Sequence, residues 1–160
     1  MLYIIIVLVI VIGEYFIKNY IENNKELGER QEILNGRIII RKHHNEGAFL
    51  NFMGEKKEML KTISCILLGL ISLLFICLLP KKGKNIFKLG LAFALGGAIS
   101  NVADRVKRGY VVDYFSFNCK KLKSIIFNLS DIAIFLGSGL ILLSSLFTAI
   151  SEGCTDKATE

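Results

Sequence analysis

Two segments of the sequence place carboxylate and amide side chains at the ends of strongly apolar stretches. The segment GGAISNVADRVKRGYVVDYF contains Asn101, Asp104 and Asp113, and the later segment FNLSDIAIFLGSGLILLSSLFTAI opens with Asn128 and Asp131. No further charge follows Asp131 within that second segment. A carboxylate in or just beneath a lipid headgroup layer is costly unless it is paired, hydrogen-bonded or facing water. These side chains therefore need partners, and the partners define a candidate site.

The two segments favour an aspartate pair, Asp113 and Asp131. Asn128 and Asp131 are three residues apart, so on a helix they share one face. Because Asp131 has no charged partner after it in its own segment, its partner must come from elsewhere, and Asp113 is the best candidate. Two carboxylates that share a site cannot both ionise cheaply, so one keeps a proton while the other activates water. Such a pair can hydrolyse an amide without a metal or a nucleophilic serine.

A plainer interpretation stays open for both aspartates. Each could cap a helix or form an ion pair with a nearby basic residue, namely Arg105, Lys107 or Arg108. The two histidines, His43 and His44, are adjacent in a polar segment, so their side chains point in different directions in most backbones. The cysteines show no metal-ligand spacing. We therefore expect no metal site and no cofactor.

Four apolar stretches can position these groups. They span about residues 2–18, 59–79, 86–103 and 125–150. At about 20 residues and 1.5 Å per residue, such a stretch crosses roughly 30 Å of hydrocarbon. The composition agrees, with 52% hydrophobic residues, a mean hydropathy of +0.51 and one proline in 160 residues. The sequence thus predicts an all-α membrane protein, a single integral domain with four transmembrane helices.

The connections between these stretches carry the remaining structural signals. A polar insert, residues 19–57, contains RIIIRKHHNEGAFLNF, whose β-branched and then aromatic residues favour one or two strands. The GYVVD segment at the exit of the third stretch resembles a turn followed by a strand. Within the third stretch, Gly90, Ala94 and Ala98 recur at four-residue spacing. Small residues at that spacing allow helices to approach closely in lipid.

The distribution of charge bears on orientation and on partners. An even number of spans puts both termini on one side with the short connection PKKGKN, and the positive-inside rule favours a cytoplasmic location for it. The other two connections carry more Lys and Arg in total, seven in residues 19–57 and six in residues 104–124. Charge alone therefore leaves the opposite orientation open. The net charge of +6 fits contact with anionic lipid headgroups, and no basic patch interleaved with aromatics suggests a nucleic acid.

The two aspartate segments resemble the C-terminal motifs of lipoprotein signal peptidase, the type II signal peptidase of bacteria. The family pattern is roughly Gly-Gly-Ala-x-x-Asn-x-x-Asp-Arg, then Gly-x-Val-Val-Asp-Phe, then Phe-Asn-x-Ala-Asp. NEGAFLNF is similar to the family's Asn-x-Gly-Ala-Ala-Phe loop, and GEYFIK weakly resembles its Asp-Gln-x-x-Lys motif. The resemblance covers nearly the whole chain and implies four helices with a small extracytoplasmic β-cradle.

Carried over by position, the resemblance implies that Asp113 and Asp131 are the catalytic pair. It also implies a set of residues that bind substrate or brace the site: Glu14, Lys18, Asn45, Gly47, Asn101, Asp104, Arg105 and Asn128. Asp104 and Arg105 would form a charge pair that anchors the turn before Asp113. The segment Asn45–Phe52 would form a lid over the substrate.

The activity that the resemblance implies is an aspartic endopeptidase. It would remove the signal peptide from diacylglyceryl-modified prolipoproteins, cutting before the lipidated Cys. The enzyme would be a monomer among membrane lipids in the bacterial cytoplasmic membrane. Both termini would be cytoplasmic, and the active site would lie near the extracytoplasmic face.

Three departures from the family pattern bear on substrate preference. Glu14 stands where the family has Asp, with Lys18 kept four residues on, and we expect a buried, site-facing pair. Ser130 replaces the usual Ala and adds a hydroxyl next to the catalytic position, and the GAF loop lacks the second small residue. Two alternatives stay open. One is an inactive relative that binds lipoproteins, and the other is a small four-span transporter or assembly factor in which Asp131 relays protons.

Overall fold

The structure is a computed structural model of the chain and describes residues 1–47, 56–119 and 122–156. In this part of the chain the helices are α1 (Leu2–Asn24), α2 (Lys57–Leu78), α3 (Asn85–Arg108) and α4 (Leu129–Asp156). The strands are β1 (Arg30–Ile33), β2 (Ile38–Asn45) and β3 (Val111–Phe117). All four of these helices are long and apolar enough to cross a membrane. The predicted membrane fold, with a small sheet added to four helices, is confirmed.

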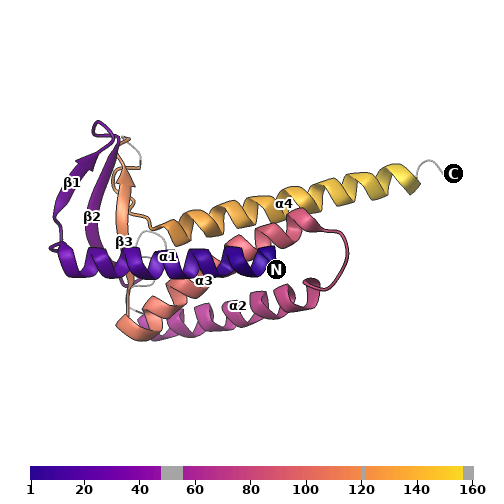
Figure 1. The fold of residues 1–160 in the computed structure, drawn as a ribbon, viewed down its shortest axis with the longest axis horizontal. Coiled ribbons are helices and arrows are strands. Elements are labelled where there is room, and N and C mark those ends of the chain that lie inside the picture. Colours follow the sequence, from indigo (N-terminus) through magenta and orange to yellow (C-terminus); the bar gives the residue numbers. More distant parts are fainter. Residues whose placement is uncertain (48–55, 120–121, 157–160) are drawn as a thin grey trace.

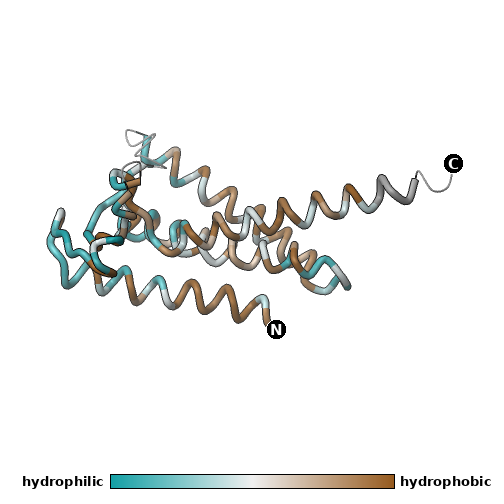
Figure 2. Tube along the Cα trace, turned by 90° about the horizontal axis from the view of Figure 1, so that it is seen from above, coloured by the Kyte–Doolittle hydropathy of each residue, from teal (hydrophilic) through white to brown (hydrophobic). Residues whose placement is uncertain are grey.

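The sheet lies at one end of the helices (Figure 1). The start of α1, the end of α4 and the connection between α2 and α3 lie at the opposite end. Figure 2 shows apolar residues along the lengths of the helices and hydrophilic residues at the sheet. This distribution is the one that a bilayer imposes on a spanning protein, because polar groups are stable only where water or internal partners reach them.

The outer faces of the helices are apolar. Large side chains such as Phe16, Leu70 and Phe147 are 65%, 59% and 67% exposed, respectively. Exposed apolar surface on this scale is unfavourable in water, whereas lipid tails solvate it. The helix faces that lack protein neighbours are therefore the faces that contact lipid.

Helix α3 is the central helix of the bundle and packs against α1, α2 and α4. Of the 18 consecutive residues that form its most apolar part, 61% are buried, whereas only 6% are buried in the corresponding part of α2. Its glycines bring it against α4, because a Cβ on Gly97 would lie 2.4 Å from the carbonyl oxygen of Ser130. A Cβ on Gly90 would lie 2.7 Å from the carbonyl oxygen of Gly137. The small residues of α3 therefore set how closely the start of α4 approaches it.

The sheet is antiparallel, with strand order β1-β2-β3. Strands β1 and β2 come from the polar insert, and β3 follows α3 directly. Register irregularity in β2 falls between Ile40 and His43, after which His43 pairs with Asp113 and Asn45 pairs with Val111. The pairing of β2 with β3 therefore carries the Asn45 side chain to Asp113.

Three helices end later than the apolar stretches predict. α1 continues to Asn24 rather than ending near residue 18, and α3 continues to Arg108 rather than ending near residue 103. α4 begins at Leu129 rather than near residue 125 and continues to Asp156 rather than ending near residue 150. The extra turns carry polar residues, but Ile21 is buried against the sheet, so tertiary packing continues the helix. Helix α3 ends at Gly109, whose φ of +82° favours glycine and turns the chain into β3. The predicted lid extends beyond Gly47 into residues 48–52, which lie outside the described ranges.

Candidate active site

Both aspartates of the pair line one cavity of about 380 Å³. Asp113 lies on β3, and Asp131 lies in the first turn of α4. Amide, imidazole and guanidinium side chains line the cavity with them: His43, Asn45, Asn101 and Arg105. The rest of the lining is mostly apolar and includes Ile134 and Phe135 of α4. The cavity lining therefore combines polar and apolar side chains.

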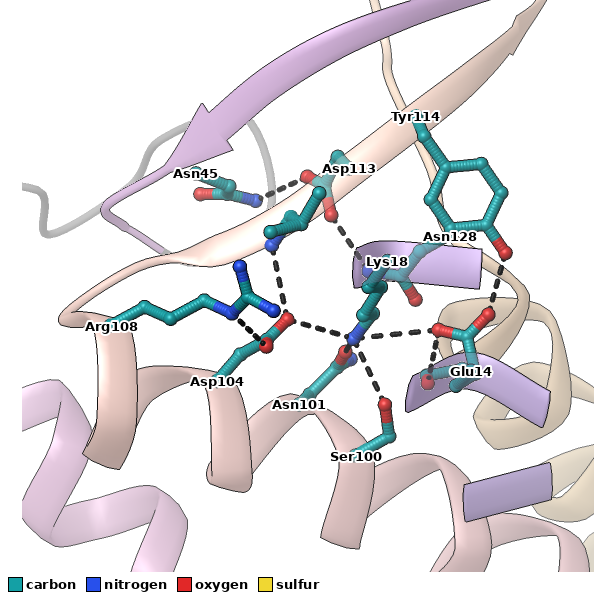
Figure 3. Close-up of polar contacts among 12 residues, drawn as sticks. Glu14, Lys18, Asn45, Ser100, Asn101, Asp104, Arg108, Asp113, Tyr114 and Asn128 are labelled. Atoms are coloured by element: carbon teal, nitrogen blue, oxygen red, sulfur yellow. Dashed lines mark hydrogen bonds and ion pairs between the residues drawn. The ribbon is translucent and has the colours of Figure 1, made fainter. Parts of the chain in front are cut away.

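Two asparagine amides hold the buried carboxylate of Asp113 (Figure 3). Asn45 Nδ2 donates to Asp113 Oδ2 at 2.9 Å, and Asn128 Nδ2 donates to Asp113 Oδ1 at 2.7 Å. Asp113 is 2% exposed. Burial, followed by the nearby charge of Asp131, raises the pKa of Asp113 to about 7, although both amide hydrogen bonds act to lower it. A carboxyl in this state can hold a proton at neutral pH.

Asp131 both caps its own helix and lines the cavity. Its backbone N–H donates to Asn128 Oδ1 at 2.9 Å, and its Oδ2 accepts from the Asn128 N–H at 3.1 Å. These reciprocal bonds form a capping box at the start of α4. Its Oδ1 accepts from Asn101 Nδ2 at 2.9 Å. The plainer role as a helix cap is therefore correct for Asp131, and it leaves the carboxylate on the cavity.

Neither aspartate of the pair makes an ion pair with a basic residue in the described part of the chain. The predicted alternative partners have other contacts. Arg108 pairs with Asp104 at 3.1 Å. Arg105 lines the cavity, and its Nη2 donates to the Gly47 carbonyl oxygen at 3.1 Å. Side-chain amides hold both aspartates in place. No cation contacts either carboxylate directly in the described part of the chain, so the negative charge of the pair is not neutralised by an ion pair.

The prediction that Asp104 forms an ion pair with Arg105 is wrong. Asp104 contacts Arg108 at one oxygen, while its Oδ2 contacts Lys18 Nζ at 3.0 Å and accepts from the Val112 N–H at 3.1 Å. Residues 104 and 108 are one helical turn apart and share a face, whereas adjacent residues do not. Asp104 nevertheless holds the turn before Asp113, through the backbone of Val112. Arg105 is left to the cavity, where its buried Nε has no partner among the described residues.

Lys18 on α1 lies against Asn101 and Asp104 of α3 and is 2% exposed. Its Nζ donates to Asn101 Oδ1 at 2.9 Å and to Ser100 Oγ at 3.0 Å, and it lies 3.4 Å from Glu14 Oε2. The predicted buried pair of Glu14 and Lys18 is present. Lys18 reaches the aspartate pair indirectly, because it fixes the amide of Asn101 that contacts Asp131.

Gly47 positions Asn45. The Gly47 N–H donates to Asn45 Oδ1 at 3.1 Å, which leaves the Asn45 Nδ2 group directed at Asp113. The other residues of the altered GAF loop lie outside the described ranges. On the opposite side, an antiparallel bridge between Phe115 and Phe127 brings the segment before α4 alongside β3. That bridge is what allows Asn128 to reach Asp113.

Three residues near the pair, Tyr114, Ser130 and His43, are not among the site residues that the sequence predicts. Tyr114 donates its hydroxyl to Glu14 Oε1, and Ser130, noted above for its extra hydroxyl, donates to Glu14 Oε2 at 2.8 Å. Tyr114 could have been found, because the quoted family pattern has Phe at this position. His43 lines the cavity, and burial, followed by the charges of Arg41 and His44, lowers its pKa. From the sequence, His43 is considered only as a metal ligand. Its position in the cavity follows from the pairing of β2 with β3, which sets His43 opposite Asp113.

These features define a class of protein: a multi-pass membrane protein with two carboxylates in a cavity at one end of its helices. The model of the family Signal peptidase (SPase) II matches residues 5–147. The lipoprotein signal peptidase of Lactobacillus johnsonii is 31% identical over 151 residues, which cover 94% of each chain. That of Shouchella clausii is 31% identical over 149 residues, covering 92% of this chain and 95% of the relative.

Solved structures agree with the fold. One bacterial membrane enzyme, solved in meso at 2.3 Å, has a TM-score of 0.79 at 24% identity, covering 92% of this chain and 88% of its own. A second, at 1.9 Å, has a TM-score of 0.76 at 25% identity, covering 90% of this chain and 92% of its own. The chain therefore belongs to the signal peptidase II family, and it is a protease of a bacterial membrane. This membership favours the peptidase over the inactive relative and over the transporter.

Proposed function

We propose that the chain removes the signal peptide from diacylglyceryl-modified prolipoproteins, cutting before the lipidated Cys, with Asp113 and Asp131 as its catalytic residues. The observation that carries this proposal is the shared cavity, which both aspartates line and at which Asn128 contacts each of them. Lipoprotein signal peptidase is the name of the relatives that match most of the chain.

The electrostatics support acid–base catalysis by the pair. Because burial and the charge of Asp131 raise the pKa of Asp113 to about 7, the two groups hold one proton between them near neutral pH. The ionised carboxylate removes a proton from water, and the water oxygen attacks the scissile carbonyl carbon. The protonated carboxyl donates a hydrogen bond to the carbonyl oxygen and then gives its proton to the leaving amine as the C–N bond breaks. The pair titrates as a unit, so either residue can carry the proton at a given step.

Arg105 is the group best suited to bind the substrate's polar backbone. Its guanidinium lines the cavity, and one N–H has no partner in the described part of the chain. A fixed cation near the reacting carbonyl stabilises the negative charge that develops on its oxygen. Asn45, Gly47, Asn101, Asp104, Asn128, Glu14 and Lys18 form the supporting set.

The apolar part of the cavity lining suits a lipidated substrate. Ile134 and Phe135 on α4 line the cavity, and Phe135 is also 59% exposed. A diacylglyceryl group attached to the Cys after the cleaved bond can therefore stay in lipid while the peptide bond lies over the aspartates. Because its acyl chains are solvated by lipid both before and after binding, they need not enter water at any step.

We infer that the sheet and the active site lie at the extracytoplasmic face and that both termini are cytoplasmic. The start of α1, the end of α4 and the basic connection with Lys81, Lys82 and Lys84 lie at the end opposite the sheet (Figure 1). The positive-inside rule favours the cytoplasm for that short connection. We further propose a monomer surrounded by membrane lipids.

The test is cleavage of a diacylglyceryl-modified prolipoprotein by the purified protein in detergent. The parent should release the signal peptide, and Asp113→Asn and Asp131→Asn should each abolish release while remaining folded in detergent. Glu58→Gln, at an exposed carboxylate on α2, is the matched control and should cleave like the parent. Cleavage by either aspartate variant at the parental rate would refute the assignment of the pair. Binding of the substrate without cleavage by the parent would instead indicate an inactive relative.

A further inference from the structure

We propose that Glu14 is a positioning residue that fixes the backbone beside both aspartates through the hydroxyls of Tyr114 and Ser130. The inference rests on the proposed function, gives Glu14 a specific role in that site and adds Tyr114 and Ser130 to its machinery. Its starting point is a relation along the chain, because Tyr114 directly follows Asp113 and Ser130 directly precedes Asp131. The two carboxylate oxygens of Glu14 each accept from one of these neighbours.

The strand geometry explains how Tyr114 acts. Successive side chains of a β-strand point to opposite faces, so Asp113 faces the cavity while Tyr114 points away from it toward Glu14 (Figure 3). The Tyr114 hydroxyl also accepts from the backbone N–H of Leu129 at 3.1 Å. Leu129 is the first residue of α4, where backbone donors have no partner inside the helix. One phenol therefore joins α1, β3 and α4.

Lys18 cannot replace the hydroxyls as the donor to Glu14. An ammonium group has three N–H donors, and Lys18 Nζ has three acceptors within 3.0 Å, on Ser100, Asn101 and Asp104. Glu14 Oε2 is farther away, at 3.4 Å. The close donors to Glu14 are thus the two hydroxyls, and a carboxylate that is 2% exposed requires such donors.

The phenol stays a donor under all ordinary conditions. Burial, followed by the charge of Glu14 and the hydrogen bond to it, raises the pKa of Tyr114 well above its usual range. The Tyr114 side chain therefore keeps its O–H directed at Glu14. Ser130 is completely buried, so its hydroxyl has no water to replace Glu14 as an acceptor.

The contacts of Glu14, Tyr114 and Ser130 help to set the distance between Asp113 and Asp131. Val112, before Asp113, is held by Asp104, while Tyr114, after it, is held by Glu14. Lys18 joins those two acidic groups. Loss of the hydroxyl contacts removes one of the restraints between β3 and the start of α4, while the Asn128 contact to Asp113 remains. A displacement of about 1 Å at reacting groups can cost about 100-fold in rate.

The decisive variants each remove one oxygen atom, Tyr114→Phe and Ser130→Ala, and are compared with the parent in the cleavage assay. Each should lower kcat about tenfold with little change in KM, because the reacting groups and not the binding surface are displaced. A larger separation weakens the influence of Asp131 on Asp113. The alkaline limb of the pH–rate profile should therefore move to lower pH. Tyr20→Phe and Ser138→Ala, at exposed positions on α1 and α4, are the controls.

A double-mutant cycle tests whether Glu14 is the common acceptor. Glu14→Asp withdraws the carboxylate by one methylene, so it should lower kcat in the parent. In the Tyr114→Phe/Ser130→Ala background it should cost much less, because the contacts that it disrupts are already gone. Interaction of this kind is expected only for residues in one network.

The outcomes separate this inference from the proposed function. Retained activity in Asp113→Asn would defeat the proposed function itself. If Asp113→Asn is inactive but Tyr114→Phe and Ser130→Ala keep the parental kcat and pH profile, only the positioning role is overturned. A lower melting temperature with unchanged kcat and pH profile would likewise overturn it and leave a structural role alone. Additive effects across the cycle would show that Glu14 is not the shared acceptor.

Discussion

Asn128 contacts the two aspartates of the site at once. Its side-chain Nδ2 donates to Asp113 at 2.7 Å, and its backbone N–H donates to Asp131 at 3.1 Å. Its Oδ1 is occupied by the backbone N–H of Asp131, which fixes the orientation of the amide group. A single buried residue thus sets the position of one carboxylate relative to the other.

Asn128→Ala should therefore damage both stability and catalysis. Loss of an N-cap side chain costs about 1 kcal/mol, and loss of the amide leaves Asp113 with one donor, from Asn45. We expect kcat to fall about 100-fold, since both acids lose a positioning contact. Initial rates and thermal melting in detergent measure the two effects. Asn24→Ala, which removes an exposed side-chain contact to a backbone carbonyl at the end of α1, is the control. A variant with the parental kcat would contradict the bridging role.

Arg105→Lys should lower kcat more than it raises KM. The guanidinium both donates to the Gly47 carbonyl oxygen and lines the cavity, and an ammonium cannot reproduce this planar array of donors. We expect a loss of about 10- to 100-fold, the scale of one lost transition-state hydrogen bond. Lys107→Arg, the reverse exchange at an exposed position two residues on, is the control and should keep the parental kcat. Equal activity in Arg105→Lys and the parent would show that only the positive charge matters.

The sequence was sufficient to predict the fold class, because the apolar stretches have bilayer length. It was also sufficient to predict that Asp113 and Asp131 lie at one site, because Asp131 needs a partner from another segment. It could also have identified the true partner of Asp104. Arg108 lies one helical turn away on the same face, whereas Arg105 is adjacent and points elsewhere. The contacts of Lys18 to Asn101 could not be predicted in this way, since they join residues 83 positions apart. Local patterns carry no information about such separations.

Close helix packing beside Asp131 gives a prediction about glycine. Gly97→Ala would put a Cβ 2.4 Å from the Ser130 carbonyl oxygen, so α4 must move away from α3. Overpacking of this kind costs about 1–3 kcal/mol, and here the displaced residue directly precedes Asp131. We expect a lower melting temperature together with reduced kcat. Gly137→Ala is equally crowded, with a Cβ 2.5 Å from the Gly90 carbonyl oxygen, but it lies farther along α4.

Comparison of these two variants separates packing from catalysis. Gly137→Ala should lower the melting temperature with a smaller effect on kcat, and Gly139→Ala should change neither, because a Cβ there meets nothing within 4 Å. Unchanged melting of Gly97→Ala in detergent would mean that the helices separate without cost.

The raised pKa of Asp113 predicts a limit on the alkaline side of activity. The pair needs one proton, and the pKa of about 7 means that this proton is lost as the pH rises above neutrality. The kcat/KM of the parent should therefore fall as the pH rises past about 7, and this limb belongs to the pair rather than to one residue. Rates measured across the pH range on a substrate without titrating groups near the cleaved bond provide the check. A flat profile through that region would contradict a shared proton.

The same pKa makes a prediction about stability, with a definite sign. The ordinary value for Asp is 3.8, and the folded value is about 7, so the folded protein binds the proton more tightly than the unfolded chain does. Asp113 therefore contributes stability that is fully present below the unfolded value and is lost as the pH rises through about 7. The side chain at position 113 of Asp113→Asn cannot titrate. The melting temperature of this variant relative to the parent should therefore increase as the pH is raised from 3.8 to about 7. Thermal melting of both proteins at matched pH values, with Glu58→Gln as the exposed-carboxylate control, measures the difference. A difference that stays constant with pH would mean that Asp113 keeps its ordinary pKa, and a pair that shares a proton near neutral pH would then be excluded.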